Sequence, residues 1–167
     1  MVEGFQSTLR DDLGVAAVMA RKGVAASAIG AALGLEMPSG PRATFADQRT
    51  VVGTGPGTWL IIADDAEPDF AEDLADRLAG LASVSDQSSG YTIRRFSGPG
   101  ARTLLQRGAA IDFDPAVFSK GSAATTVISH IGVILWQADD MPAYDCAVFR
   151  SFDSSFQHWI DQSIHAL

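Results

Sequence analysis

The stretch from Asp86 to Leu105 constrains the fold more than any other part of this 167-residue chain. It reads DQSSGYTIRRFSGPGARTLL. Tyr91–Phe96 is rich in aromatic and β-branched residues, which favours a strand. Ser97–Gly100 then makes a sharp corner, because glycine adopts backbone conformations closed to other residues and proline has the φ that a helix start needs. The segment therefore predicts a strand, a corner and a helix through Gln106.

The same order of a strand, a glycine and a helix occurs once earlier in the chain. Val15–Ala20 is a short apolar run that favours a buried strand, and it leads into a glycine at Gly23. Val24–Leu33 is rich in alanine and predicts a helix that Gly34 closes. Sequence identity between the two regions is negligible, so the shared order of elements is evidence only for a similar topology of the two halves.

Hydrophobic spacing and turn residues predict the remaining elements. Further strands are expected at Thr44–Thr54, Thr58–Ala63, Ala82–Ser85, Thr125–His130, Val133–Ala138 and Tyr144–Phe149. Two apolar stripes predict helices, one on Phe70, Leu74, Leu78 and Leu81 and one on Phe152, Phe156, Ile160 and Ile164. Ser151 is expected to cap the last helix, and Gly132 to mark a bulge or tight turn.

The predicted order is β-α-β-β-α-β followed by β-α-β-β-β-α. Each half can place its helices on one face of an antiparallel sheet, so the fold class is α+β with two ferredoxin-like halves at about 14–87 and 91–166. No linker is long or polar enough to argue for two independent domains. Residues 1–167 are therefore expected to form a single domain.

Charge argues against two classes of partner. The formal net charge is −8, and Lys22 and Lys120 are the only lysines. Nucleic acids and anionic membrane surfaces both attract clustered Lys and Arg, so neither is an expected partner. Charged residues make up 19% of the chain, below the globular average of about 25%. Either another protein covers part of the surface, or the domain is simply rich in alanine and glycine.

The cellular compartment is predicted from three features. Cys146 is the only cysteine, so no intrachain disulfide can form, which fits a reducing compartment. The first twelve residues carry acids where a signal peptide has bases and an apolar run. Val24–Leu35 is the most apolar stretch, and it is too short to span a bilayer. A soluble, cytoplasmic protein is expected.

Two glycine-rich segments invite comparison with phosphate-binding loops. Gly53–Gly57 contains Pro56, which removes an amide donor, and a strand follows it, so a hairpin turn is the preferred interpretation. Ser97–Gly100 opens a helix and could hold an anion, although its proline is already explained by the helix start. Neither lysine lies in a Walker loop, and no G-x-S-x-G elbow is present.

The reactive side chains favour structural interpretations. His130, His158 and His165 lack metal-ligand spacing. His130 is expected to be a half-buried, hydrogen-bonded imidazole within a strand, and His158 to be exposed or interfacial. Cys146 alternates with Tyr144 and Val148 and is expected to be a small core residue. No catalytic, cofactor-binding or metal-binding residue is therefore assigned.

Carboxylates and tryptophans leave some alternatives open. The pairs Asp11-Asp12, Asp64-Asp65 and Asp139-Asp140 are interpreted as solvated turn residues. Asp86 and Asp112 each lie at an element boundary, where capping a turn is the default role and acid chemistry the alternative. The three tryptophans can serve the core or a subunit interface; they are Trp59, Trp136 and Trp159.

The order of several short motifs resembles one family, the gamma subunit of heterotetrameric sarcosine oxidase. The matching segments are Leu33–Pro38, Gly55–Leu60, Asp86–Ser88, Arg95–Ala101 with Leu104-Leu105, Asp112–Asp114 with Phe118 and Gly121, and Phe149–Phe152 before a helix that contains tryptophan. The resemblance covers about Val15 to Ile160. No single motif is diagnostic, but their order and spacing together are.

The resemblance implies a fold similar to the folate-binding region of the glycine-cleavage aminomethyltransferase. It also implies a complex that oxidatively demethylates sarcosine to glycine and passes the one-carbon unit to tetrahydrofolate. FAD, FMN, NAD, tetrahydrofolate and zinc would belong to the alpha, beta and delta subunits. This chain would then be a structural subunit without cofactor or active site, held chiefly by the alpha subunit.

A second hypothesis is a stand-alone tetrahydrofolate-binding or aminomethyl-transfer protein of the same fold. It requires a carboxylate in a pocket near the pterin. Asp86 and Asp112 are the candidates for that carboxylate.

Overall fold

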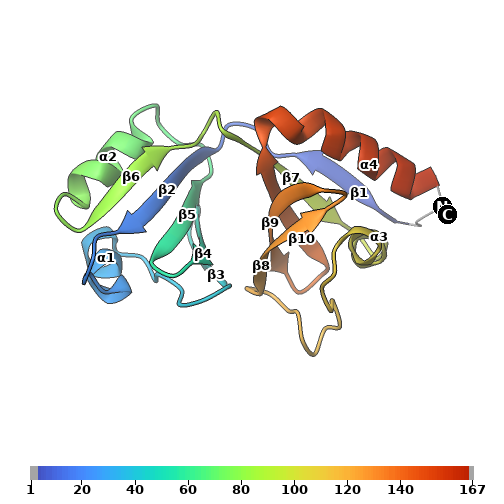
Figure 1. Cartoon of the computed structure of the whole chain (residues 1–167), viewed down its shortest axis with the longest axis horizontal. Helices are drawn as coiled ribbons and strands as arrows, with labels where there is room; N and C mark the ends of the chain where they lie inside the picture. Colours follow the sequence, from blue (N-terminus) through green and yellow to red (C-terminus); the bar gives the residue numbers. More distant parts are fainter. Residues whose placement is uncertain (1–3, 166–167) are drawn as a thin grey trace. The chain divides into compact units, whose positions relative to one another are not determined.

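A computed structural model describes residues 4–165 of the chain (Figure 1). The chain divides into two compact units. One is the continuous unit, residues 11–90. The other is the discontinuous unit, residues 1–10 together with 91–167. Each unit has one five-stranded antiparallel sheet and its own helices, which is the predicted α+β class.

The continuous unit contains five strands and two helices. Its strands are β2 (Gly14–Ala20), β3 (Ala43–Ala46), β4 (Arg49–Gly55), β5 (Thr58–Ala63) and β6 (Ala82–Asp86), and its helices are α1 (Ala26–Leu33) and α2 (Phe70–Arg77). The sheet order is β3-β4-β5-β2-β6. Without β3, the order of the β-α-β-β-α-β elements is that of a ferredoxin-like fold, with the first and third strands at the centre.

One strand prediction in the continuous unit is wrong. Residues 44–54 form two antiparallel strands, β3 and β4, in place of one. The chain reverses at Asp47, whose φ is +49°. Aspartate tolerates this left-handed conformation because its short polar side chain bonds locally. The alternation of apolar residues runs through both strands and hides the turn.

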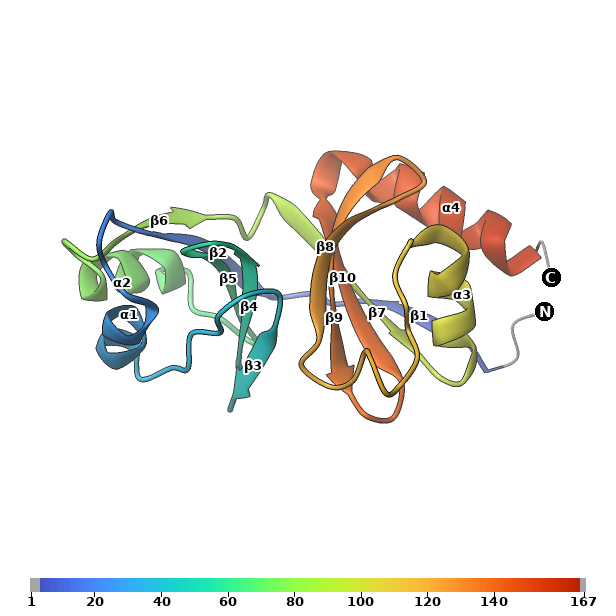
Figure 2. The same cartoon turned by 60° about the horizontal axis from the view of Figure 1, so that its bottom comes forward.

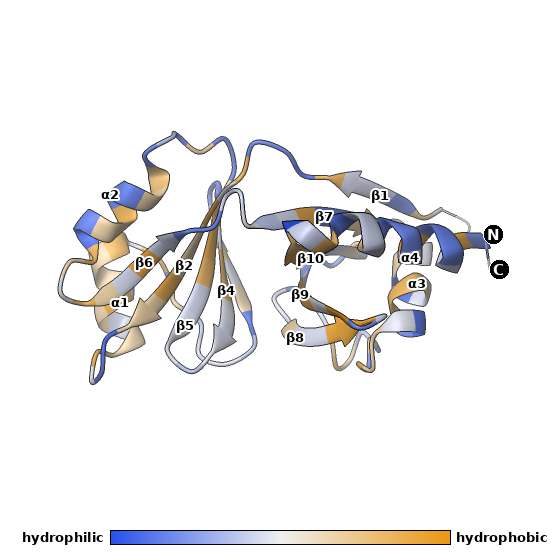
Figure 3. Ribbon diagram, turned by 45° about the horizontal axis from the view of Figure 1, so that its top comes forward, coloured by the Kyte–Doolittle hydropathy of each residue, from blue (hydrophilic) through white to orange (hydrophobic). Residues whose placement is uncertain are grey.

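The core of the continuous unit lies between its sheet and its helices. Ile29 of α1, together with Leu74 and Leu78 of the α2 region, packs with residues of β2 and β5. Figure 3 shows hydrophilic and hydrophobic residues alternating around α2, as expected for a helix with one buried face. Gly34 closes α1 with a φ of +67°, as predicted.

The discontinuous unit also contains five strands. Its α-helices lie on one face of the sheet (Figure 2). Its strands are β1 (Gln6–Leu9), β7 (Tyr91–Ser97), β8 (Ala123–Ile128), β9 (Ile131–Asp139) and β10 (Ala143–Phe149). Its helices are α3 (Gly100–Gly108), the short 3₁₀ helix η1 (Arg150–Phe152) and α4 (Asp153–His165). The sheet order is β1-β7-β10-β9-β8, with β8, β9 and β10 joined as a meander.

Strand β1 was not predicted from the sequence. Its four residues QSTL show no clear alternation, and three of the four are exposed. It forms the sheet edge by antiparallel pairing with β7, Gln6 opposite Ser97 and Leu9 opposite Arg94. Backbone pairing creates this strand with little help from side-chain burial.

Three further predictions in the discontinuous unit are wrong. His130 lies outside β8 and is exposed, because the chain turns at Ser129 and His130, both with positive φ. This turn replaces the one expected at Gly132, which lies inside β9. Ser151 lies within η1 and does not cap α4, which starts at Asp153. A 3₁₀ turn between the strand and the helix moves the helix start by one residue.

The core of the discontinuous unit is larger and more aromatic. Phe96 of β7 contacts Phe5 at 5.4 Å and Phe156 of α4 at 6.0 Å between ring centroids. Phe113 lies edge-on to Tyr144 at 5.7 Å. Leu104 and Leu105 of α3 join the same cluster and are fully buried. Within residues 4–165, no helix is long and apolar enough to cross a membrane.

Candidate functional site

The two glycine-rich segments have structural roles. Pro56 and Gly57 form the turn between β4 and β5, which confirms the predicted hairpin. At the corner before α3, Gly98 has a φ of +89°, and a Cβ there would collide with the carbonyl oxygen of Gly4. Glycine is therefore required at residue 98 both for its conformation and for the close approach of the N-terminal segment.

Asp86 and Asp112 both cap turns. Asp86 is exposed and accepts a hydrogen bond from the Ser88 amide at 2.9 Å. This bond, followed by one from the Ser88 hydroxyl, lowers the pKa of the Asp86 carboxyl. Asp112 is exposed and accepts from the Asp114 amide at 2.9 Å. Both carboxylates have the geometry of Asx turns, and neither is a desolvated acid.

Cys146 is a core residue, as predicted. It is fully buried, and burial together with the neighbouring Asp145 raises the pKa of its thiol well above the ordinary value. A thiol that stays protonated is a poor nucleophile. His158 and His165 are exposed on α4, and a ring nitrogen of His165 lies 2.6 Å from the Asp161 carbonyl oxygen.

The tryptophans serve the cores of the two units. Trp59 and Trp136 are 4% and 0% exposed. The Trp59 indole donates a hydrogen bond to the Pro38 carbonyl at 2.8 Å. Trp159 is partly buried and stacks on Phe156 at 5.6 Å. Of the two roles left open by the sequence, the structure supports core packing.

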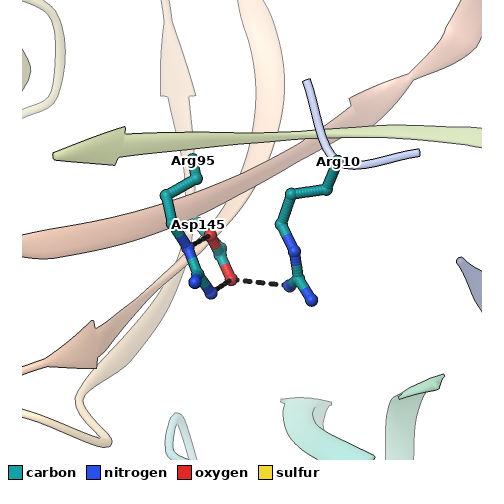
Figure 4. Close-up of polar contacts among 3 residues, drawn as sticks. All are labelled: Arg10, Arg95 and Asp145. Carbon is teal, nitrogen blue, oxygen red and sulfur yellow. Dashed lines mark hydrogen bonds and ion pairs between the residues drawn. The ribbon is translucent and has the colours of Figure 1, made fainter. Parts of the chain in front are cut away.

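A cluster of three charged residues in the discontinuous unit was not identified from the sequence. Asp145 on β10 is 1% exposed, and its carboxylate accepts two bonds from Arg95 of β7, at 2.8 and 2.7 Å. A third bond comes from Arg10, which follows β1, at 2.8 Å (Figure 4). Arg95 lies 50 positions and Arg10 lies 135 positions from Asp145 in the sequence, so only the pairing of three strands brings them together.

This cluster has the chemistry of a structural ion pair. Two guanidinium groups hold Asp145 with charge-assisted hydrogen bonds, and one of them binds it in the bidentate geometry that suits a carboxylate. Arg94, on the other face of β7, makes a second bidentate pair with Asp153 at the start of α4, at 3.0 Å for both bonds. Together the pairs fix β1, β7, β10 and α4 to one another.

Each unit carries a surface hollow. The hollow on the continuous unit has a volume of about 490 Å³ and is rimmed by Asp12, Asp65, Glu67 and Asp86. The hollow on the discontinuous unit has a volume of about 420 Å³ and is mostly apolar. Within residues 4–165, no group of three or more His, Cys, Asp or Glu side chains is arranged to hold a metal ion.

Exposed aromatic residues mark the end of β10. Phe149 and Phe152 are 52% and 46% exposed. Phe149 stacks on Tyr91 at 5.0 Å, and Arg150 donates to the Tyr91 carbonyl at 3.2 Å. Phe149, Arg150 and Phe152 belong to the Phe149–Phe152 motif of the family resemblance. Their exposure is typical of surfaces that contact proteins.

Comparison with protein families decides the classification. The model of the sarcosine oxidase gamma subunit family matches residues 17–166. The chain belongs to this family. The sarcosine oxidase subunit gamma of Corynebacterium sp. (strain P-1) is 31% identical over 152 residues, which are 89% of this chain and 72% of the relative. That of an Arthrobacter species is 31% identical over 150 residues, with the same two coverages.

Solved structures agree on the fold of this gamma-family chain. A chain of the heterotetrameric sarcosine oxidase from Corynebacterium sp. U-96 has a TM-score of 0.86 at 23% identity, over 97% of this chain and 84% of the other. The glycine cleavage system aminomethyltransferase T from Bartonella henselae has a TM-score of 0.68 at 10% identity, over 94% of this chain and 45% of the other. The fold expected from the resemblance is confirmed.

Proposed function

We propose that the chain is the gamma subunit of a heterotetrameric, flavin-dependent sarcosine oxidase complex. That complex demethylates sarcosine oxidatively to glycine and transfers the one-carbon unit to tetrahydrofolate. The family match over residues 17–166 is the observation that carries the proposal. The partners are the alpha, beta and delta subunits, chiefly alpha, and the complex works in the cytoplasm.

Within the complex, the role of this chain is structural. The groups that could perform chemistry already have structural roles: Cys146 is buried with a raised pKa, and the Asp145 carboxylate is held by two guanidinium groups. Asp86 and Asp112 cap turns at the surface. FAD, FMN, NAD, tetrahydrofolate and zinc are assigned to the other subunits.

Co-expression with the three other subunits tests the proposal. The full chain should co-purify with alpha, beta and delta in equal amounts. A preparation from cells without this chain should give less assembled complex and less sarcosine oxidase activity. Failure of the wild-type chain to associate with any of the other subunits at micromolar concentration would contradict the proposal.

Titration with tetrahydrofolate separates the structural role from folate binding by the chain alone. The isolated chain should show no saturable binding by calorimetry. The variants Asp86→Asn and Asp112→Asn keep the acceptor oxygen that caps each turn but remove the charge. Both should leave the activity of the assembled complex within twofold of wild type. Saturable binding that either variant abolishes would favour the tetrahydrofolate-binding hypothesis.

A further inference from the structure

The apolar hollow of the discontinuous unit, called the Met141 groove here, is the strongest unassigned feature of the surface. Its volume is about 420 Å³, within the range of roughly 300–1,000 Å³ that binding pockets occupy. Seven residues line it: Ser97, Gly98, Pro99, Asp139, Met141, Pro142 and Ala143. One wall is the corner before α3, and the other is the loop between β9 and β10.

The loop presents its methionine to solvent. Met141 is 80% exposed, the highest value among the large hydrophobic side chains of residues 4–165. Its backbone is nevertheless anchored, because the Met141 amide donates to Asp139 Oδ1 at 3.3 Å. The side-chain amide of the buried Gln137 donates to the Asp139 carbonyl at 3.0 Å. A flexible, polarisable side chain on a fixed loop is well suited to fill an irregular apolar contact.

The opposite wall is fixed as well. Gly98 has no side chain to fill the corner, and the Gly4 carbonyl lies directly behind it. Pro99 is exposed at the start of α3, and its ring fixes the backbone angle φ. The groove therefore exists before any partner binds, which reduces the entropy lost on binding.

Charge favours one kind of occupant. Asp139 is the only charged residue among the seven that line the groove, and the whole chain has a net charge of −8. A second copy of the chain would bring Asp139 and the same negative charge to a symmetric contact, which is unfavourable. A partner with an apolar side chain next to a lysine or arginine would match both the groove and the carboxylate.

We infer that the Met141 groove is a docking site for another subunit of the complex, which inserts an apolar side chain flanked by a basic residue. The inference rests on the proposed function, because it supplies a contact surface for the gamma chain. It goes further by naming the surface and the chemistry of the partner segment.

Binding of the purified full-length chain to the remaining subunits tests this inference. Met141→Glu places a second carboxylate at the groove and should weaken binding at least tenfold. Met141→Ala should weaken it severalfold through lost apolar contact. The control Val127→Glu changes another exposed apolar residue of the same unit, 55% exposed on β8, and should stay within twofold of wild type.

Asp139→Asn tests the charge separately. Asparagine keeps the acceptor for the Met141 amide, so the loop should keep its conformation. Binding should weaken at low salt and depend less on ionic strength than wild-type binding. Circular dichroism of each variant should match wild type, because the changed side chains lie at the surface.

The possible outcomes are distinguishable. Wild-type affinity in Met141→Glu would overturn the inference and leave the proposed function intact. A wild-type dimer in sedimentation that Met141→Glu abolishes, with subunit binding unchanged, would assign the groove to a second copy and also overturn it. A small molecule that wild type retains in native mass spectrometry and Met141→Glu does not would assign the groove to a small ligand and would also overturn the inference. Absence of any subunit binding by wild type would defeat the proposed function and this inference together.

Discussion

The two units are similar in architecture but differ in how the chain closes them. All sheet partners of the continuous unit come from residues 11–90, and three of its strands are joined by short turns. In the discontinuous unit β1 pairs with β7, although residues 11–90 lie between these two strands in the sequence. Bringing two such distant strands together costs more loop entropy than forming a hairpin.

The two units also differ in how far their ion pairs are buried. Three of the four β1 residues are exposed, so apolar burial contributes little to holding this strand. Arg10, directly after β1, donates to the buried Asp145. In the continuous unit, by contrast, Arg77 and Asp73 pair on one turn of α2, with side chains 55% and 54% exposed. The comparison suggests that buried charge pairs compensate for a strand that joins from far away in the sequence.

Replacing the buried carboxylate is the strongest test of this comparison. Asp145→Ala leaves two arginines without their shared acceptor, and we expect a loss of about 2–3 kcal/mol in the free energy of unfolding. The loss should be below that of a fully buried pair because Arg95 remains 41% exposed to water. Urea denaturation measures the effect, and hydrogen exchange should show lost protection in β1 first.

The matched control for this prediction is Asp73→Ala. Its exposed pair should contribute no more than about 0.5 kcal/mol. Equal losses in the two variants would mean that the Asp145 cluster does not anchor β1.

The two corner glycines give a second, smaller contrast. Gly98→Ala meets both a positive φ and the Gly4 carbonyl, so we expect a loss of about 2 kcal/mol or more. Gly23, at the equivalent corner of the continuous unit, has a φ of +81° but no atom within 4 Å of an added Cβ. Gly23→Ala should therefore cost only the backbone strain, about 1 kcal/mol.

Thermal unfolding of both glycine variants provides the measurement. If Gly23→Ala were as destabilising as Gly98→Ala, the close approach of the N-terminal segment would have no energetic role.

The smallest expected effect is the titration of Asp86 in the continuous unit. Hydrogen bonds from Ser88 place its folded pKa below the ordinary value of 3.8. Its contribution to stability is therefore fully present above about pH 4 and is lost as the pH falls through the folded pKa. Carboxyl-carbon NMR should give a midpoint below 3.8, and Ser88→Ala should raise that midpoint part of the way back.

A midpoint at or above 3.8 in the wild-type chain would show that the Asx turn at Asp86 does not persist in solution. Asp86→Asn serves as the control, because its side chain keeps the acceptor and does not titrate in this range.

Sequence reasoning identified most elements where the pattern is local. The strand at Tyr91–Ser97, the corner at Gly98 and the helix after it follow from residue types within a few positions of one another. The same holds for α1 and its closing Gly34. The errors at Asp47, Ser129 and His130 share a cause, because all three have a positive φ, which residues other than glycine adopt uncommonly.

The sequence by itself determined the α+β class, the family and most of the order of strands and helices, because hydrophobic periodicity and turn chemistry act over short distances. Only the tertiary structure decided the place of β1, the Arg10–Asp145–Arg95 cluster and the Met141 groove. Their residues are distant in sequence, and they meet only after strand pairing fixes the register. Each side chain gives no local sign of its partner, which is the physical reason why these features could not be predicted.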